Sequence, residues 1–334
     1  MLLSLVLLLA LLLNVWVILA LWFHRPRRVQ LRYLPLGLWL LIWSTSVLCL
    51  WRGDYLPAAL WLAAGLAPVL LWWRGLLPTG QGDWADDVAY TTTGALDGDT
   101  LSLQRVREFR WLTREQYEPV WCSREYALSQ LQTVDMITSF WGLRPIAHVL
   151  VSFGFADGRY LTFSVEIRRQ KHEEFSVLGG FFKHFELNIV ASEERDMVRV
   201  RTNCREGDAY LYRTRISAEN GRKLLLGFVE AANTLAVEPR FYHTLKANCT
   251  TIVYTMAKRI HPELPLDYRL LLSGYLDEYV FARGGLQSGY SLAELRLRGR
   301  ITDLARQAPD DASFSRHIRE GVPGCTQAEQ PFQK

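Results

Sequence analysis

The chain has 334 residues, of which 38 are Lys or Arg and 34 are Asp or Glu. The formal net charge of +4 is small for this length, and basic residues alternate with acidic ones, which argues against a nucleic-acid partner. The five cysteines form no CxxC pair, so neither a zinc site nor a disulfide framework is indicated. We therefore expect no metal or other cofactor, and the length leaves room for one large domain with accessory segments.

The N-terminal region is strongly apolar. Residues 1–23 are almost uninterrupted hydrocarbon and lack the basic start and small-residue cleavage site of a signal peptide, so we expect a retained anchor. Two further apolar stretches, 33–51 and 56–73, are joined by the short segment WRGDYLP, which is typical of a tight helical hairpin. Residues 1–74 are therefore predicted to form a membrane anchor of three transmembrane helices.

Charge alone leaves the orientation of this anchor open. The connector HRPRRVQLR after the first apolar stretch holds four Arg, and the positive-inside rule places such a connector in the cytoplasm. With three spans, the remainder of the chain would then be cytoplasmic as well. The segment after Trp73, however, becomes acidic after one Arg, and the hairpin need not cross the membrane fully.

The sequence predicts that the rest of the chain forms a linker followed by one domain. Residues 75–90, with three Gly, one Pro and three Asp, form the linker. Six segments are expected as strands: 100–112, 148–155, 159–168, 185–191, 197–203 and 209–216. Residues 117–141 are expected to mix loop and short helix, and residues 217–236 to form a helix.

Strands that precede helices indicate an α+β domain, in which an antiparallel sheet packs on helices. We place this domain at residues 91–324. The polar residues 325–334 are expected to form a C-terminal tail.

One predicted hairpin can be aligned from its own sequence, HVLVSFGF, ADG and RYLTFSVEIR. If ADG is a three-residue loop with Gly158 in the left-handed conformation, opposed positions sum to 314 and one face becomes entirely apolar. His148 then lies opposite Glu166, with Cβ atoms about 5 Å apart. A carboxylate that fixes the tautomer of a His is one half of a thiol triad, although an ordinary cross-strand pair on a solvated face has the same sequence.

A thiol lies at the predicted start of the last helix. Asn248 is a good N-cap, and the residues after Cys249 carry apolar side chains at helical spacing. The positive end of a helix dipole stabilises a thiolate. A small, buried and unreactive Cys would fit this position as well. Together with His148 and Glu166, however, Cys249 completes a nucleophile, a base and an orienting acid.

The order of IAHVLVSFGF, FSVEIR and FYHTLKANCTT resembles the periplasmic domain of the Lnb-type bacterial lipoprotein N-acyltransferases, over roughly residues 83–324. The resemblance implies a circularly permuted papain-like fold, similar to that of lecithin:retinol acyltransferases, whose nucleophile helix also begins with an NC dipeptide. It implies Cys249 as nucleophile, His148 as base and Glu166 as orienting acid. It also implies a multi-pass protein of the bacterial cytoplasmic membrane whose soluble domain faces the periplasm.

By this resemblance, the chain moves an acyl chain from a phospholipid to the N-terminal amine of diacylglyceryl-cysteine in a lipoprotein, through a thioester on Cys249. Backbone N–H groups at the helix start would hold the oxyanion. Arg168 is a candidate for attracting the lipid phosphate, although an ion-paired or solvated Arg fits equally. Tyr242 and Asn248 are candidates for shaping the substrate site, although capping alone explains Asn248.

Two alternatives stay open at this point. The first is a membrane-anchored cysteine hydrolase, a thioesterase or a peptidase, which uses the same triad with water as acceptor. The second is a non-catalytic membrane module in which the three residues are structural.

Overall fold

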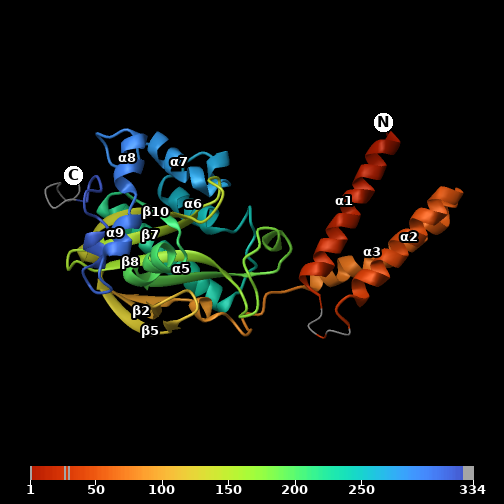
Figure 1. Cartoon of the computed structure of the whole chain (residues 1–334), viewed down its shortest axis with the longest axis horizontal. Helices are drawn as coiled ribbons and strands as arrows, with labels where there is room; N and C mark the ends of the chain where they lie inside the picture. Colours follow the sequence, from red (N-terminus) through yellow and green to blue (C-terminus); the bar gives the residue numbers. More distant parts are fainter. Residues whose placement is uncertain (1, 26–27, 29–30, 326–334) are drawn as a thin grey trace. The chain divides into compact units, whose positions relative to one another are not determined.

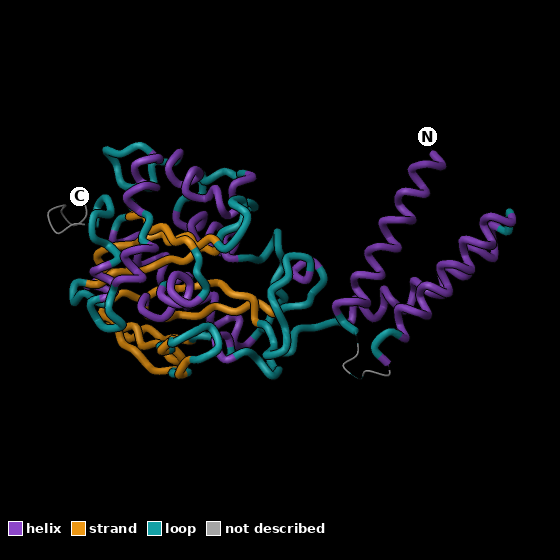
Figure 2. Tube along the Cα trace, viewed as in Figure 1, coloured by secondary structure: helices purple, strands orange, loops and turns teal. Residues whose placement is uncertain are grey.

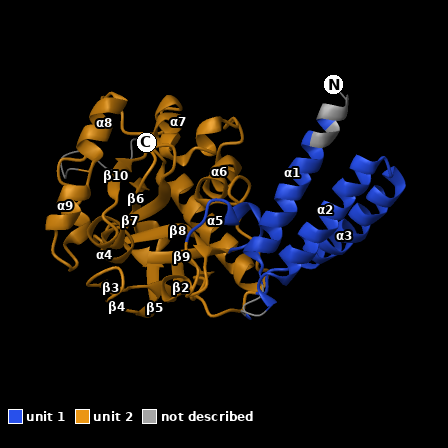
Figure 3. Cartoon of the chain, turned by 45° about the vertical axis from the view of Figure 1, so that its right-hand side comes forward, with its two compact units in different colours: residues 1–79, 175–185 blue, residues 80–174, 186–334 orange. Residues whose placement is uncertain are grey.

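The computed structural model describes residues 2–25, 28 and 31–325 (Figure 1). The chain divides into two compact units (Figure 3). The first unit consists of Met1–Thr79 and Phe175–Phe185, and the second of Gly80–Glu174 and Glu186–Lys334. Of the expected polar tail, residues 326–334 lie outside the described part of the chain, as do residues 26–27 and 29–30 of the arginine-rich connector.

The first unit contains three helices, α1 (Leu2–Phe23), α2 (Leu34–Arg52) and α3 (Tyr55–Gly75). Helices α2 and α3 are each long and apolar enough to cross a membrane. In α1, the apolar helical segment found among the described residues is shorter and covers Leu8–Phe23. The Ser46 hydroxyl donates to the Ala58 carbonyl at 2.7 Å, which joins α2 to α3. The predicted helical hairpin is confirmed, and the number of membrane spans stays a prediction.

A loop from the second half of the chain belongs to this first unit. It connects the strands β8 (Tyr160–Arg168) and β9 (Glu186–Glu193). Lys183 Nζ donates to the carbonyl oxygens of Trp73 and Leu76, at 2.8 and 3.3 Å, where the end of α3 leaves carbonyls without helical partners. Phe182 stacks on Phe23, with ring centroids 5.6 Å apart. The end of this loop, at Phe182 and Lys183, therefore packs on the helices α1 and α3.

The second unit is built on an eight-stranded sheet with the order β1-β2-β9-β8-β7-β6-β10, in which β5 pairs with β2 (Figure 2). Neighbouring strands are antiparallel except β2 and β9, which meet in parallel at Arg107 and Ser192. The other strands of this sheet are β1 (Thr93–Asp97), β2 (Thr100–Arg107), β5 (Trp121–Ala127), β6 (Leu131–Phe140), β7 (His148–Phe155) and β10 (Asp208–Arg213). A separate two-stranded sheet is formed by β3 (Arg110–Trp111) and β4 (Tyr117–Glu118).

Helices cover both faces of the eight-stranded sheet. On one face, α5 (Ala218–Val237) and α6 (Cys249–Ile260) share a core with the sheet in which Phe153, Phe163 and Phe228 are central. The opposite face packs on α4 (Glu194–Met197), α9 (Thr302–Gln307) and α10 (Phe314–His317) around a second core. The remaining helices are α7 (Leu276–Ala282) and α8 (Leu292–Gly299). An α+β domain with a mostly antiparallel sheet packed on helices is confirmed.

Two expectations about local structure were wrong. Residues 117–141, expected as loop and short helix, contain β5 and β6, and β6 is buried on both faces, so it lacks the alternation of a half-exposed strand. Residues 197–203, expected as a strand, form the end of α4 and a π-helix, Val200–Cys204. The alternation of Val and Arg is misleading there, because Arg201 points inward and is only 6% exposed.

Candidate active site

The hairpin of β7 and β8 has the register predicted from its sequence. Every pair from Leu150 with Ser164 to Gly154 with Tyr160 sums to 314, and Gly158 has a φ of 84°. The face opposite the apolar one is not solvated, because Leu150 and Ser164 are both fully buried there. Pairing between the two strands stops at Leu150 and Ser164. His148 therefore lies just beyond the last pair, at one end of the sheet.

Ser164 bridges the imidazole and the carboxylate of the predicted pair. The Ser164 hydroxyl donates to Glu166 Oε1 at 2.6 Å and lies 2.6 Å from His148 Nε2. The direct distance from His148 Nε2 to Glu166 Oε1 is longer, at 3.3 Å. Because the hydroxyl gives its proton to the carboxylate, it accepts one from Nε2–H. The neutral imidazole then presents Nδ1 as its basic nitrogen.

Arg201 is a site residue that the sequence did not reveal. Its Nη2 donates to Glu166 Oε1 at 2.6 Å, and its Nη1 donates to the Met197 carbonyl at 2.7 Å. The side chain of Arg201 is 7% exposed, and that of Glu166 is 15% exposed. The π-helix turns this guanidinium toward the sheet, where it holds the Glu166 carboxylate in place and keeps it ionised. π-Helical turns occur frequently at functional sites, and no sequence signal marked this one.

Cys249 is the first residue of α6 and is 9% exposed. The Asn248 side chain accepts hydrogen bonds from the amides of Thr250 and Thr251, at 2.9 and 2.8 Å, and the Thr251 hydroxyl accepts from the Asn248 amide at 3.0 Å. This capping box occupies two of the amides that were expected to hold an oxyanion. The amide of Cys249 itself forms no hydrogen bond with any residue in the described part of the chain.

The electrostatics of the site favour an ionised thiol. Burial raises the pKa of Cys249, but His148, the Val149 amide and Thr250 outweigh burial, and the net shift is downward. Burial lowers the pKa of His148, and the charge of Glu166 more than reverses this. Burial likewise raises the pKa of Glu166, but the charges of His148 and Arg201 bring it well below the usual range of a carboxyl. The arrangement therefore stabilises a thiolate and an imidazolium beside a carboxylate.

Other thiols of the second unit lack this environment. Burial raises the pKa of Cys122 to about 11 and that of Cys325 to about 12. Burial also raises the pKa of Cys204. Cys249 is the one of these four whose thiolate is stabilised.

Tyr242 lies in the loop before α6, close enough to Cys249 and Glu166 for their charges to affect the pKa of its phenol. Burial raises the pKa of its phenol, and the negative charges of both groups raise it further. The Tyr242 hydroxyl makes no hydrogen bond to a residue that the structure describes. The structure thus brings Tyr242 into the site, where its hydroxyl can donate a hydrogen bond to a substrate.

Two other predicted residues are held by structural contacts. Arg168 donates to the carbonyls of Val88 and Ala89, at 3.2 and 2.6 Å, and its guanidinium stacks over Trp84 at 4.7 Å. These contacts fix the segment that enters the second unit, and phosphate binding by Arg168 stays a prediction. Asn248 acts as a helix cap, as described above. No group of three His, Cys, Asp or Glu side chains suited to a metal occurs among the described residues.

The fold and the site define a membrane-associated α+β domain that brings a thiol, an imidazole and a carboxylate together at one end of a sheet. Residues 117–274 match the family model of the Lnb N-terminal periplasmic domain, and this segment includes Cys249, His148 and Glu166. The match confirms the resemblance to the Lnb-type family found in the sequence. No curated protein and no solved structure gives a significant match.

The family match also bears on location and fold. A periplasmic domain family, together with the apolar helices α2 and α3, fits a membrane protein with a periplasmic domain. The permuted papain-like arrangement stays a prediction, because no solved structure matches the chain.

Proposed function

We propose that the protein is a multi-pass membrane acyltransferase, which moves an acyl chain from a phospholipid to the N-terminal amine of diacylglyceryl-cysteine in a lipoprotein. The observation that carries the proposal is the position of the mostly buried Cys249 thiol, at the first residue of α6 and beside an imidazole that Ser164 and Glu166 orient. These partners lower the pKa of the thiol. A buried thiol without such partners has a raised pKa, as Cys122 has. The family match supports the membrane and lipoprotein context.

The first half of the reaction forms a thioester. The Cys249 thiolate attacks the ester carbonyl of the phospholipid, and a carbon–sulfur bond forms. Two hydrogen-bond donors, the Cys249 amide and the Tyr242 hydroxyl, are available to stabilise the oxyanion that develops. When the ester carbon–oxygen bond breaks, the His148 imidazolium gives its proton to the departing alkoxide, and a lysophospholipid leaves.

The second half transfers the acyl chain to nitrogen. The α-amine of the diacylglyceryl-cysteine attacks the thioester carbon, and neutral His148 takes the proton that the amine loses. The carbon–sulfur bond breaks, which restores the thiolate and the imidazolium and releases an amide. Glu166 stays ionised throughout and stabilises the imidazolium. A membrane anchor confines the enzyme to the bilayer that holds both substrates, which replaces a search in three dimensions.

The test uses the full chain in nanodiscs that contain a phospholipid with deuterated acyl chains, and a synthetic diacylglyceryl-cysteine peptide as acceptor. Mass spectrometry should find deuterated acyl on Cys249 and, with the peptide, a deuterated amide at its N-terminus. Cys249→Ala should form neither. Acyl on Cys249 that yields only free fatty acid would favour the hydrolase, and the absence of any acyl-enzyme would favour a non-catalytic module.

A further inference from the structure

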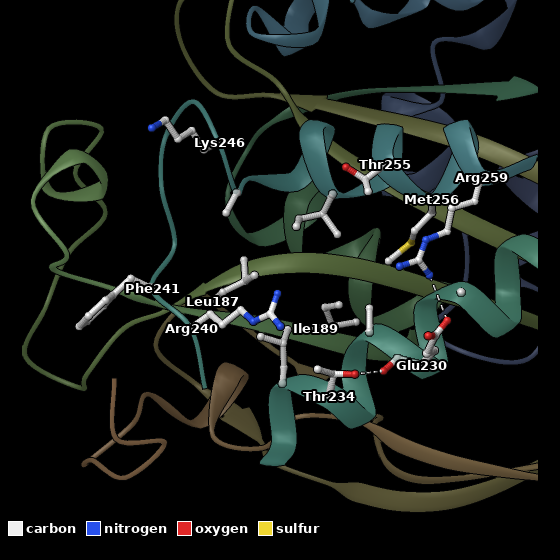
Figure 4. Close-up of a pocket in the computed structure, with 15 residues that line it drawn as sticks. Leu187, Ile189, Glu230, Thr234, Arg240, Phe241, Lys246, Thr255, Met256 and Arg259 are labelled. Atoms are coloured by element: carbon white, nitrogen blue, oxygen red, sulfur yellow. Dashed lines mark hydrogen bonds and ion pairs between the residues drawn. The ribbon is translucent and has the colours of Figure 1, made fainter. Parts of the chain in front are cut away.

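A groove with a volume of about 330 Å³ runs between α5, α6 and the start of β9 (Figure 4). Apolar side chains dominate its lining: Leu187, Ile189, Leu235, Phe241, Ile252 and Met256. The hydroxyls of Thr234 and Thr255, which also line it, donate to carbonyls one helical turn earlier, at 2.9 Å each. Their polar atoms are therefore satisfied within the helices, and the groove suits an apolar ligand.

The lining of the groove includes residues on either side of the candidate nucleophile in the sequence, although Cys249 itself is not part of it. Cys249, Ile252 and Met256 are spaced by three and then four residues in α6, so they lie along one face of that helix. Ile252 and Met256 line the groove, as does Ala247, two residues before Cys249. A ligand with its carbonyl carbon at the thiol can extend along α6 into the groove.

We propose that this groove holds the acyl chain of the donor phospholipid whose ester carbonyl reacts with Cys249. The inference rests on the proposed function, to which it adds the site and the chemical class of the donor chain. A groove of this size that apolar side chains line for most of its surface removes much of an alkyl chain from water, as the bilayer does.

The charges on the rim of the groove favour a phospholipid. Arg259 pairs with Glu230 at 3.1 Å, and Arg240 lies 3.8 Å from Glu238. Lys246 forms no ion pair with any residue in the described part of the chain, and it precedes Cys249 by three residues. Figure 4 places Lys246 in the loop that leads to α6, at the opposite end of the groove from Arg259. Its ammonium is therefore the group available to the phosphate when the ester lies at the thiol.

Gly227 keeps the groove open. It lies in the middle of α5, where Gly is less favourable than Ala because it is the poorer helix former. A Cβ at this position would touch only Met256 Cγ and Cβ, at 3.8 and 3.9 Å, which is ordinary van der Waals contact. Backbone packing therefore does not require a Gly at this position. A larger side chain would instead occupy the groove beside Met256.

The test locates the acyl chain of the lipid directly by photocrosslinking. The full-length Cys249→Ala variant is placed in nanodiscs with phosphatidylcholine that carries a diazirine midway along one acyl chain. Crosslinked peptides should map to the groove residues of α5 and α6 as well as to the apolar helices of the first unit. Adding Gly227→Leu should reduce the crosslinks to α5 and α6 at least tenfold. Ala236→Leu, an enlargement of similar size on an exposed part of α5, should leave them unchanged.

Each outcome decides one question. Crosslinks confined to α1, α2 and α3, or crosslinks to α5 and α6 that Gly227→Leu does not reduce, would overturn the groove assignment. If the groove crosslinks appear but the wild-type chain forms no Cys249 thioester, the proposed function fails and the lipid site stands. If the wild-type chain forms the Cys249 thioester but no groove crosslinks appear, the proposed function stands and the groove assignment fails. The Gly227→Leu variant should unfold at a temperature at least as high as that of the parent, since Leu is the better helix former.

Discussion

Ser164 stands between the two ionisable groups that orient the thiol. The sequence contained a signal for it, because Ser164 lies two positions before Glu166 and therefore on the same face of β8. The Ser164 hydroxyl links the imidazole to the Glu166 carboxylate through two contacts of 2.6 Å, one to each group. The direct contact between imidazole and carboxylate is longer, at 3.3 Å. The orientation of His148 thus depends on two other side chains of the same hairpin, Ser164 and Glu166.

The lowered pKa of Cys249 has a direct chemical readout. Because the thiolate persists as the pH falls until the lowered pKa is reached, iodoacetamide should alkylate Cys249 with a midpoint below about pH 8.5, the usual thiol pKa. Cys122 and Cys325 should react only at higher pH. In His148→Ala, burial remains and the stabilising imidazole is lost, so the midpoint for Cys249 should rise. A wild-type midpoint at or above the usual value would contradict the assignment.

Substitutions in the triad should differ in severity. Cys249→Ala should have background activity, and His148→Ala should be close to it, because no base remains to accept or return a proton. Glu166→Gln should be impaired but measurable, since a mispositioned imidazole is still basic. Single-turnover acylation in nanodiscs ranks the three. A Glu166→Gln variant as inactive as Cys249→Ala would give this carboxylate a role beyond orientation.

Glu166→Gln also carries a stability cost that must be separated from its effect on activity. The change leaves Arg201 buried without its counter-charge, which should lower the free energy of unfolding by about 3 kcal/mol. The double variant Glu166→Gln with Arg201→Met should recover most of this stability and none of the activity. Thermal unfolding and acylation, measured on the same samples, separate the two effects.

At the scale of elements, the hairpin of β7 and β8 could be predicted because two local signals agree. Gly158 fixes the loop, and alternation fixes the faces. Helix α5 could be predicted from its Ser217 cap and its apolar stripe. The π-helix could not, because its alternating Val and Arg residues also fit a strand. Burial of Arg201 against Glu166 is a tertiary contact between positions 35 residues apart, which no local pattern contains.

The start of α6 allows the two interpretations of Asn248 to be tested. If Asn248 acts as a cap, Asn248→Ala should lower the free energy of unfolding by about 1 kcal/mol, and Asn248→Ser should restore most of it. Thermal unfolding of the full chain measures both. An Ala variant that is as stable as the wild type but slow in acylation would instead place the Asn248 amide against the substrate.

At the scale of the whole molecule, the apolar N-terminal region and the α+β domain were both recognisable in the sequence, but the division between the two units was not. From the sequence we expected residues 91–324 to form one domain. Residues 175–185 belong instead to the unit of α1, α2 and α3. Phe182 in this loop is 7% exposed, and its ring contacts Phe23 and Trp73, which are more than 100 residues away in the sequence.

A truncated chain should reveal this dependence. A fragment that starts at Gly80 keeps residues 175–185 and loses the helices that pack on them, so it should expose Phe182 and self-associate. The same fragment with 175–185 replaced by a Gly/Ser segment of equal length should remain monomeric. Size-exclusion chromatography compares the two fragments. Equal monomer content in both would show that the loop does not need its helical partners.

The placement of residues 175–185 also changes what proteolysis can do to this protein. The backbone passes between the two units three times, after Thr79, after Glu174 and before Glu186. A single cut in the linker would separate α1, α2 and α3 covalently from the rest of the chain, but residues 175–185 would still bind these helices through their own contacts. Release of the domain therefore requires, besides that cut, either loss of contacts such as those that hold Lys183 to the end of α3, or cleavage on both sides of the loop.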